Sequence, residues 1–371
     1  MKKFNTGALR PALDAARLSS ANDLVRRTLA QHGLLPDAVG GQASGLTAAM
    51  PQALNMLAGL QANLGSHAKT AGVKTGAVKA GSAKTGAAEF RQEHYDCAAG
   101  SRSFRTYVPS SAESGVTGIV LMLHGCTQTA EDFALGTDMN AQAERHGFVV
   151  IYPQQSRGSN AQSCWNWFSR GDQQRDRGEP AILAGMTSQV MREFGVPSDR
   201  VFVAGLSAGA AMAVILGETY PDVFSAIGVH SGLPFGAAND VSSAFSAMAG
   251  RNLADAVPSG PNTSLRTIIF HGSTDSTVHP ANGEQIAEHS VSRCAEPTIE
   301  TVEQGSAGGR SFARRITTTV NGFAKLEHWI VDGLGHAWSG GRAEGTFTDP
   351  RGPDASHEMI RFFFDAPEPA T

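Results

Sequence analysis

From residue 89 onward, short apolar runs alternate with segments in which apolar residues recur every three or four positions. Some runs, such as 118–123, are continuously apolar, which is typical of strands covered on both faces. The pattern predicts strands at 103–108, 118–123, 148–152, 201–204, 226–229, 267–270 and 326–331. It predicts helices at 129–146, 180–194, 208–220, 280–291 and 355–364. Repeated strand–helix–strand units indicate an α/β protein with a mostly parallel central sheet and helices on both faces.

The first 88 residues follow a different pattern. Residues 1–64 contain short amphipathic stretches and predict a helical arm. In residues 65–88 a lysine recurs at every fifth position among Thr, Gly, Ala and Ser, a period that fits neither helix nor strand. Such a segment has too little apolar surface to offset the entropy of ordering it, so it predicts a flexible linker. The α/β domain is expected to occupy residues 89–371.

Composition and charge narrow the class of protein. Of the 371 residues, 41% are hydrophobic and 17% charged, which excludes a wholly disordered or fibrous chain. Residues 1–88 hold ten basic and three acidic side chains, so they carry +7, and the remainder carries −11. The basic linker is either a solvated spacer or a tether attracted to an anionic surface, such as a polymer granule. Nothing in the sequence indicates specific nucleic-acid recognition.

Targeting signals are weak. Met1, Lys2, Lys3 and Phe4 resemble the start of a signal peptide, but charged residues and a proline interrupt the apolar segment that should follow. No stretch approaches 18 consecutive apolar residues, so no transmembrane segment is predicted. These observations favour a cytoplasmic or non-classically exported protein. Disulfides among the four cysteines would instead point to the extracellular space.

The strongest chemical motif is Gly-Leu-Ser-Ala-Gly at residues 205–209. It lies between a predicted strand and an apolar helix, the context in which G-x-S-x-G forms a sharp turn that exposes the serine. Ser207 is therefore the candidate nucleophile. The alternative is an ordinary Gly-rich connection between a strand and a helix.

A serine nucleophile needs a base and an acid that orients the base. On this kind of sheet the chain order is Ser, Asp or Glu, then His, with each partner following a strand. Asp275 follows strand 267–270 and His336 follows strand 326–331, so they are the candidate acid and base. His271 and His230 also end strands, and structural roles are expected for both. Asp332 is too close to His336 along the chain to orient it, and Asp222 is expected at the surface.

Acyl transfer also requires hydrogen-bond donors for the negative charge that develops on the carbonyl oxygen. One expected donor is the backbone amide of Ala208, directly after the nucleophile. The second should come from the loop at 124–128, where the amide of Cys126 is preferred over that of Thr127. A reading of Cys126 as the nucleophile is disfavoured because Ser207 has a complete set of partners. The reaction predicted from these residues requires neither a metal nor an organic cofactor.

The cysteines are either two disulfides or four buried thiols, and none has the CxxC spacing of a zinc or redox site. Cys126 and Cys164 lie in loops that both leave the same edge of the sheet, which predicts a disulfide between them. Cys97 and Cys294 would then pair by elimination. Trp165, Trp167 and Trp338 are candidates for lining an apolar substrate pocket, and the alternative is packing beneath loops.

Five motifs in order resemble the poly(3-hydroxybutyrate) depolymerase family of esterases, whose cousins are feruloyl and acetylxylan esterases. They are residues 123–128 (Leu-His-Gly-Cys-Thr-Gln), 164–168 (Cys-Trp-Asn-Trp-Phe), 205–212, 271–278 and 335–341. The resemblance covers roughly residues 90–365. It implies an α/β-hydrolase fold with Ser207, Asp275 and His336 as the triad, in agreement with the spacing argument.

The resemblance makes a polyester of the hydroxybutyrate type, or its oligomers, the expected substrate. Secreted polymer depolymerases usually add a signal peptide and a C-terminal polymer-binding module, whereas only 35 residues follow His336 here. This departure favours oligomers or soluble esters over crystalline polymer. The alternatives are a feruloyl or acetyl esterase acting on plant polysaccharide, and a granule- or surface-binding protein without activity. The complete triad argues against the last of these.

Overall fold

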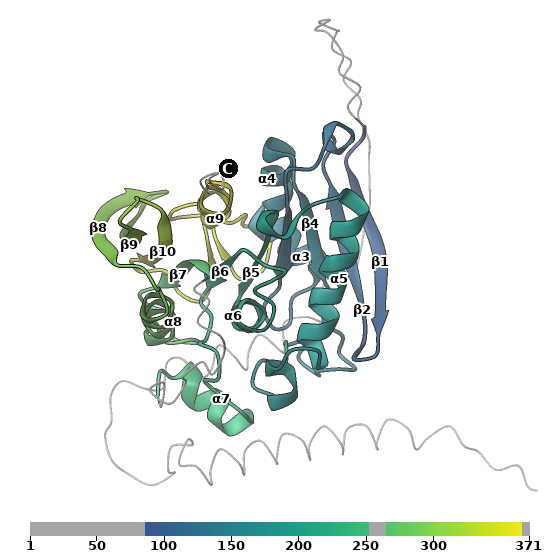
Figure 1. Cartoon of the computed structure of the whole chain (residues 1–371). Helices are drawn as coiled ribbons and strands as arrows, with labels where there is room; N and C mark the ends of the chain where they lie inside the picture. The colour runs from purple at the N-terminus through teal and green to yellow at the C-terminus, as the bar shows by residue number, and fades with distance from the viewer. Residues whose placement is uncertain (1–85, 252–264, 366–371) are drawn as a thin grey trace, which may run out of the picture. The chain divides into compact units, whose positions relative to one another are not determined.

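The computed structural model describes residues 86–251 and 265–365. The predicted arm at 1–64 and nearly all of the predicted linker lie outside these residues. A ten-stranded sheet forms the centre of the described part, with the strand order β1-β2-β4-β3-β5-β6-β7-β10-β9-β8 (Figure 1). The six inner strands are parallel to one another, which confirms the prediction of a mostly parallel sheet.

The inner strands coincide with the apolar runs of the sequence. They are β3 (Ile119–Leu123), β4 (Val149–Pro153), β5 (Val201–Leu206), β6 (Ala226–His230), β7 (Arg266–Gly272) and β10 (Ala324–Val331). Every residue of β3 to β7 is buried. Strands covered on both faces need apolar side chains at every position rather than at alternate ones, which explains why the runs are continuous.

Helices cover both faces of the sheet, and each face has its own hydrophobic core. One core contains residues of α5 (Gly178–Phe194), α6 (Ala208–Thr219), α7 (Val241–Met248) and α8 (Ala281–Ser292). The other contains residues of α3 (Ala130–Thr137), α4 (Met139–His146) and α9 (Ala355–Phe364). Along β3, Leu121 packs in the first core and Met122 in the second, as the alternation of a strand requires.

The structure differs from the sequence predictions in several places. The helix predicted at 129–146 is two helices, because Asp138 between α3 and α4 has a left-handed backbone with φ 54°. Helix α7 was not predicted. Neither were the outer strands β1 (Glu89–Cys97), β8 (Thr298–Ala307) and β9 (Arg310–Thr319). Strands β1 and β8 are largely exposed and polar, so they lack the apolar run that marks the inner strands.

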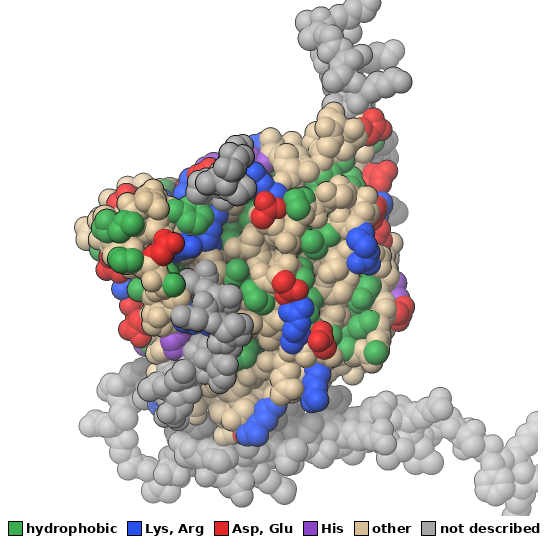
Figure 2. Space-filling view, in the orientation of Figure 1, with side chains coloured by type: hydrophobic (Ala, Val, Ile, Leu, Met, Phe, Trp, Pro, Cys, Tyr) green, Lys and Arg blue, Asp and Glu red, His purple; other side chains and the backbone are tan. Residues whose placement is uncertain are grey.

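The remaining strands are peripheral. β2 (Gly100–Val108) pairs antiparallel with β1 and β4, and begins three residues before its predicted start. β11 (Trp338–Ser339) and β12 (Thr348–Asp349) form a separate pair. Figure 2 shows acidic and basic side chains interspersed over the face that carries α5 and α6. Within residues 86–251 and 265–365, no helix is long and apolar enough to cross a membrane.

The parallel strands bring the predicted site together. Their carboxyl ends meet at one edge of the sheet, so the segments that follow them lie at that edge. Ser207 directly follows β5, Asp275 follows β7, and His336 follows β10. The loop at 124–128 follows β3, which neighbours β5.

Candidate active site

Ser207 occupies a strained turn between β5 and α6. Its backbone has φ 59° and ψ −120°, in the region that residues with a side chain rarely adopt. The flanking glycines permit the turn: a Cβ atom on Gly209 would overlap the carbonyl oxygen of Leu123, and one on Gly205 would overlap Gly209. The amide of Ser207 donates to the carbonyl of His230 at 2.9 Å. These contacts leave the serine at the start of α6, only partly buried.

The structure brings Asp275 and His336 into direct contact. Oδ2 of Asp275 accepts a hydrogen bond from Nδ1 of His336 at 2.8 Å. Oδ1 accepts from the amides of Thr277 and Val278, both at 2.9 Å. The carboxylate side chain has no exposed surface, whereas the imidazole is 12% exposed.

These contacts fix the charge of Asp275. Burial by itself would raise the pKa of the carboxyl group. The hydrogen bond and nearby charge of His336, with the Val278 amide, outweigh burial, so the pKa of Asp275 lies below its ordinary value. A carboxylate held in this way keeps the Nδ1 hydrogen of His336 in place, which leaves Nε2 as the basic nitrogen.

The turns that carry the acid and the base are bonded to each other. Thr274 donates to the carbonyl of Leu334 through its amide at 3.1 Å and through its hydroxyl at 2.9 Å. The amide of Ser273 donates to Val331 at 2.9 Å. A Cβ atom on Gly272 would overlap the Leu334 carbonyl, so a glycine is required for this approach.

The rival histidines are buried and have structural partners. His271 is 0% exposed, and its Nε2 lies 2.8 Å from the carbonyl of Val278 and 3.7 Å from Oδ2 of Asp275. His230 is also 0% exposed, and its Nε2 accepts from the amide of Ser339 at 3.0 Å. Mainly through burial, and further through His271 and His336, the pKa of His230 falls to about 3. A neutral imidazole of this kind suits a fixed acceptor rather than a base.

The rival acids also lie away from the base. Asp332 is exposed and accepts from the hydroxyl of Ser273 at 3.2 Å. Asp222 lies at the surface, as predicted, and forms two hydrogen bonds with Arg175 at 2.6 and 2.9 Å. Neither contacts His336 in the described part of the chain.

The sequence left two candidates in the loop after β3 for the second oxyanion donor, the amides of Cys126 and Thr127. The amide of Thr127 donates to the carbonyl of Gln162 at 2.8 Å, so it is already engaged. The amides of Cys126 and Ala208 have no acceptor among residues 86–251 and 265–365. Side-chain contacts hold the loop: Oε1 of Gln128 accepts from the Gly125 amide at 2.9 Å, and Nε2 of Gln128 donates to Thr346 at 2.9 Å.

The predicted disulfide between Cys126 and Cys164 is present. It joins the loop after β3 to the loop after β4. The predicted pairing of Cys97 with Cys294 is wrong, because the structure leaves Cys97 outside any disulfide. Cys97 ends β1, which is the outermost strand on one side of the sheet. Cys294 follows α8, which packs on β7 and β10, nearer the outermost strand on the opposite side.

The tryptophans are placed differently from the prediction. Trp165 is 0% exposed and its Nε1 donates to the carbonyl of His124 at 3.0 Å. Trp338 is also 0% exposed, donates to Ser356 at 3.1 Å and packs edge-on against Phe133. Both indoles are packing residues here, so the expectation that they line a substrate pocket is not met. Trp167 is 6% exposed, and substrate contact there stays a prediction.

Sequence reasoning missed a buried carboxylate, Glu179, which accepts hydrogen bonds from the loop that carries Cys164. It precedes Pro180 at the start of a helix, where an acidic residue is common at the surface, so the sequence had no signal for burial. As for metals, the described residues contain no group of three or more His, Cys, Asp or Glu that could hold an ion.

The chain is similar in sequence to known esterases. The sequence profile of the esterase PHB depolymerase family matches residues 102–301, more than half of the chain. Poly(3-hydroxyalkanoate) depolymerase C of Paucimonas lemoignei is 34% identical over 247 residues, which cover 64% of this chain and 58% of that protein. Probable acetylxylan esterase A of Aspergillus fumigatus is 32% identical over 192 residues, covering 47% of this chain and 51% of that protein. The chain thus spans little more than half the length of these relatives.

Solved structures share the fold. The acetyl xylan esterase from Aspergillus awamori superposes with a TM-score of 0.54 at 23% identity, over 71% of this chain and 93% of that one. An S-formylglutathione hydrolase from Agrobacterium tumefaciens has a TM-score of 0.50 at 14% identity, over 77% and 98%. These similarities confirm the predicted α/β-hydrolase fold. The family profile spans β2 to β8 and includes the turn that carries Ser207. The chain therefore belongs to the esterase PHB depolymerase family.

Proposed function

We propose that the protein hydrolyses carboxylic esters through an acyl-enzyme on Ser207. The observation that carries the proposal is the 2.8 Å hydrogen bond between Asp275 and His336, at the sheet edge where Ser207 emerges. Family membership supports it, because the matching profile is that of an esterase.

In the first half of the reaction, Oγ of Ser207 attacks the ester carbonyl carbon while Nε2 of His336 takes the hydroxyl proton. The negative carbonyl oxygen accepts hydrogen bonds from the amides of Cys126 and Ala208. The carbonyl re-forms, the C–O bond to the alcohol breaks, and the alcohol leaves with the proton from His336. Asp275 stays ionised and stabilises the imidazolium.

In the second half, water attacks the acyl carbon and gives a proton to Nε2 of His336. The tetrahedral intermediate then collapses, the carboxylic acid departs, and Oγ of Ser207 regains its proton. His336 accepts and returns each proton that is transferred in this cycle.

The substrate we propose is a polyester of the 3-hydroxybutyrate type or its oligomers, in line with the depolymerase relative. A second candidate is an acetylated plant polysaccharide, favoured by relatives and a solved structure that bear the name acetylxylan esterase. Release of acid from hydroxybutyrate trimers, compared with release of acetate from acetylated xylan, decides between them.

The activity itself is tested with Ser207→Ala. We expect hydrolysis of p-nitrophenyl butyrate to fall by about 10⁴-fold or more while the circular dichroism spectrum is unchanged. An organophosphonate should label the wild type at Ser207 and leave the variant unmodified. Ser188→Ala, which removes a hydroxyl bonded to a helix carbonyl on α5, is the matched control. Turnover by Ser207→Ala at the wild-type rate would refute the mechanism.

A further inference from the structure

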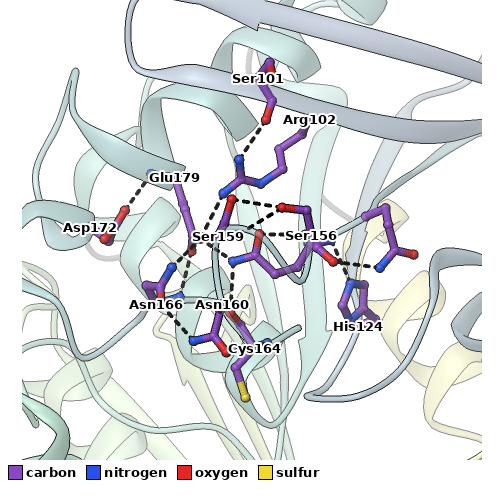
Figure 3. Close-up of polar contacts among 12 residues, drawn as sticks. Ser101, Arg102, His124, Ser156, Ser159, Asn160, Cys164, Asn166, Asp172 and Glu179 are labelled. Carbon is purple, nitrogen blue, oxygen red and sulfur yellow. Dashed lines mark hydrogen bonds and ion pairs between the residues drawn. The ribbon is translucent and has the colours of Figure 1, made fainter. Parts of the chain in front are cut away.

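A buried carboxylate lies behind the proposed oxyanion loop. Glu179, in the first turn of α5, is only 3% exposed, and its carboxylate accepts hydrogen bonds from three residues. Oε2 accepts from the amide of Asn166 at 2.7 Å. Oε1 accepts from the side chain of Asn166 at 2.9 Å, from Nη2 of Arg102 at 3.2 Å and from Nε2 of Gln155. Figure 3 shows Arg102 and Asn166 on either side of Glu179, with dashed lines for the hydrogen bonds.

The first route from Glu179 to the site runs through hydrogen bonds. Gln155 contacts Glu179 with its side chain, and its backbone amide donates to Nε2 of His124 at 3.1 Å. His124 must then carry its hydrogen on Nδ1, which lies 2.8 Å from the carbonyl oxygen of Gly125. That oxygen belongs to the same peptide unit as the amide of Cys126. Because a trans peptide is planar, holding its C=O also fixes the direction of its N–H.

The second route from Glu179 runs through hydrogen bonds of Gln155 and ends in a covalent link. Nε2 of Gln155 also donates to the carbonyl of Cys164 at 2.9 Å, and the Cys126–Cys164 disulfide links that residue to the oxyanion loop. Both routes therefore start at Glu179 and end at Cys126.

On one side of the network there are no packed neighbours that could hold these residues in place of the hydrogen bonds. A cavity of about 560 Å³ lies beside the network, with Arg102, Ser156, Ser159, Asn166 and Glu179 among its lining residues. A segment that borders open space lacks neighbours to hold it there, so its polar contacts must do so. His124 is fully buried, and mainly for that reason its pKa falls to about 4, which keeps the ring neutral and able to accept from Gln155.

We infer that Glu179 is a positioning residue for the oxyanion hole, which sets the direction of the Cys126 amide through Gln155, His124 and the disulfide. The inference rests on the proposed esterase function. It assigns Glu179 no contact with substrate.

The test is Glu179→Gln, which keeps the shape but turns an NH₂ group toward the surrounding N–H donors. Because a displacement of about 1 Å in a reacting group costs roughly 100-fold in rate, we expect kcat for p-nitrophenyl butyrate to fall by about 10- to 100-fold. KM should stay within about twofold, since the amide acts mainly on the transition state. A second readout is independent of turnover: dithiothreitol should reduce the Cys126–Cys164 bond faster in the variant, as measured by alkylation and mass spectrometry.

Glu327→Gln is the matched control. Glu327 is equally buried, with a side chain 3% exposed, and it is paired with Arg361. It lies in the middle of β10, before the carboxyl end of that strand. The Glu327→Gln protein should be less stable than the wild type, but its kcat and its rate of disulfide reduction should be unchanged. All variants are compared at a temperature where circular dichroism shows them folded.

If Glu179→Gln does not fold, Gln155→Met tests the same links at similar volume and should give the same loss of kcat. In the double variant the losses should not multiply, because both substitutions break one chain of contacts. Wild-type kcat and disulfide reduction in a folded Glu179→Gln or Gln155→Met would overturn the inference. An active Ser207→Ala would instead overturn the proposed function, so the two failures are distinguishable.

Discussion

The imidazole of His230 accepts a hydrogen bond from the backbone amide of Ser339 across 3.0 Å. The same residue accepts from the Ser207 amide through its carbonyl at 2.9 Å. His230 therefore connects the nucleophile turn to the segment that follows His336. Its ring stacks on Trp338 with centroids 5.1 Å apart, which holds the acceptor atom in place.

We expect His230→Phe to keep the stacking and lose the acceptor. The buried Ser339 amide would then have no partner, which costs about 1–3 kcal/mol. Urea denaturation should show this loss, and kcat should fall because the segment after His336 loses an anchor. His94→Phe, at a side chain that is 52% exposed, is the control and should change neither quantity appreciably. An unchanged unfolding free energy in His230→Phe would show that the bond contributes nothing.

The disulfide gives a second prediction. Cys126 and Cys164 are separated by 38 positions. Closing a loop of that length lowers the entropy of the unfolded chain, which raises the free energy of unfolding by roughly 3–4 kcal/mol. The variant Cys126→Ser/Cys164→Ser should unfold at lower urea concentration by a comparable free energy. Its activity should fall but persist, because the backbone amide at position 126 remains. Cys97→Ser should behave as wild type, since Cys97 forms no disulfide. Complete inactivity of a folded double variant would point to a direct chemical role of a cysteine.

Stability should decline on the acid side of neutrality. Burial is the main cause that lowers the pKa of His124 to about 4 and of His230 and His328 to about 3. In the unfolded chain a histidine titrates near 6.5, so below that pH the unfolded state binds protons that the folded state does not. The free energy of unfolding should therefore fall between about pH 6.5 and pH 3–4, by up to about 1.4 kcal/mol per pH unit for each histidine.

Urea denaturation at several pH values checks this slope. His328 is 3% exposed and lies against Arg315 and Glu284, and it is not a member of the proposed triad. His328→Gln should flatten the pH dependence, whatever it does to the stability at pH 8. A slope in His328→Gln equal to that of the wild type would show that His328 does not take up a proton on unfolding, which would contradict the prediction.

The fourth prediction concerns the basic segment of residues 1–88, nearly all of which lies outside the described residues. Residues 1–88 carry +7, and β1 begins at Glu89. Removal of residues 1–88 should spare hydrolysis of soluble esters, because every proposed active-site residue lies after them. It should weaken binding to anionic particles at low salt, where the Debye length is roughly 30 Å at 0.01 M. Co-sedimentation with anionic vesicles or polyester granules measures the difference. Equal binding by both proteins would show that residues 1–88 act only as a spacer.

Local patterns of apolar residues in the sequence were sufficient to predict much of the fold. The inner strands could be predicted because burial on both faces requires continuous apolar runs, as in β3 and β5. The outer strands β1 and β8 could not, because their side chains are mostly exposed and their pairing depends on partners next to them in the sheet. The burial of Trp338 could not be predicted from the sequence either, because it depends on contacts with Ser356 and Phe133.

The sequence by itself determined the candidate nucleophile, acid and base, because each follows a recognisable strand and the motif at 205–209 requires a specific turn. Only the tertiary structure decided which amide of the 124–128 loop is available, since the contact that engages Thr127 comes from Gln162, 35 residues away. It also decided the roles of His230 and Glu179. Hydrogen bonds between distant segments depend on how the chain folds back on itself, and no local periodicity encodes them.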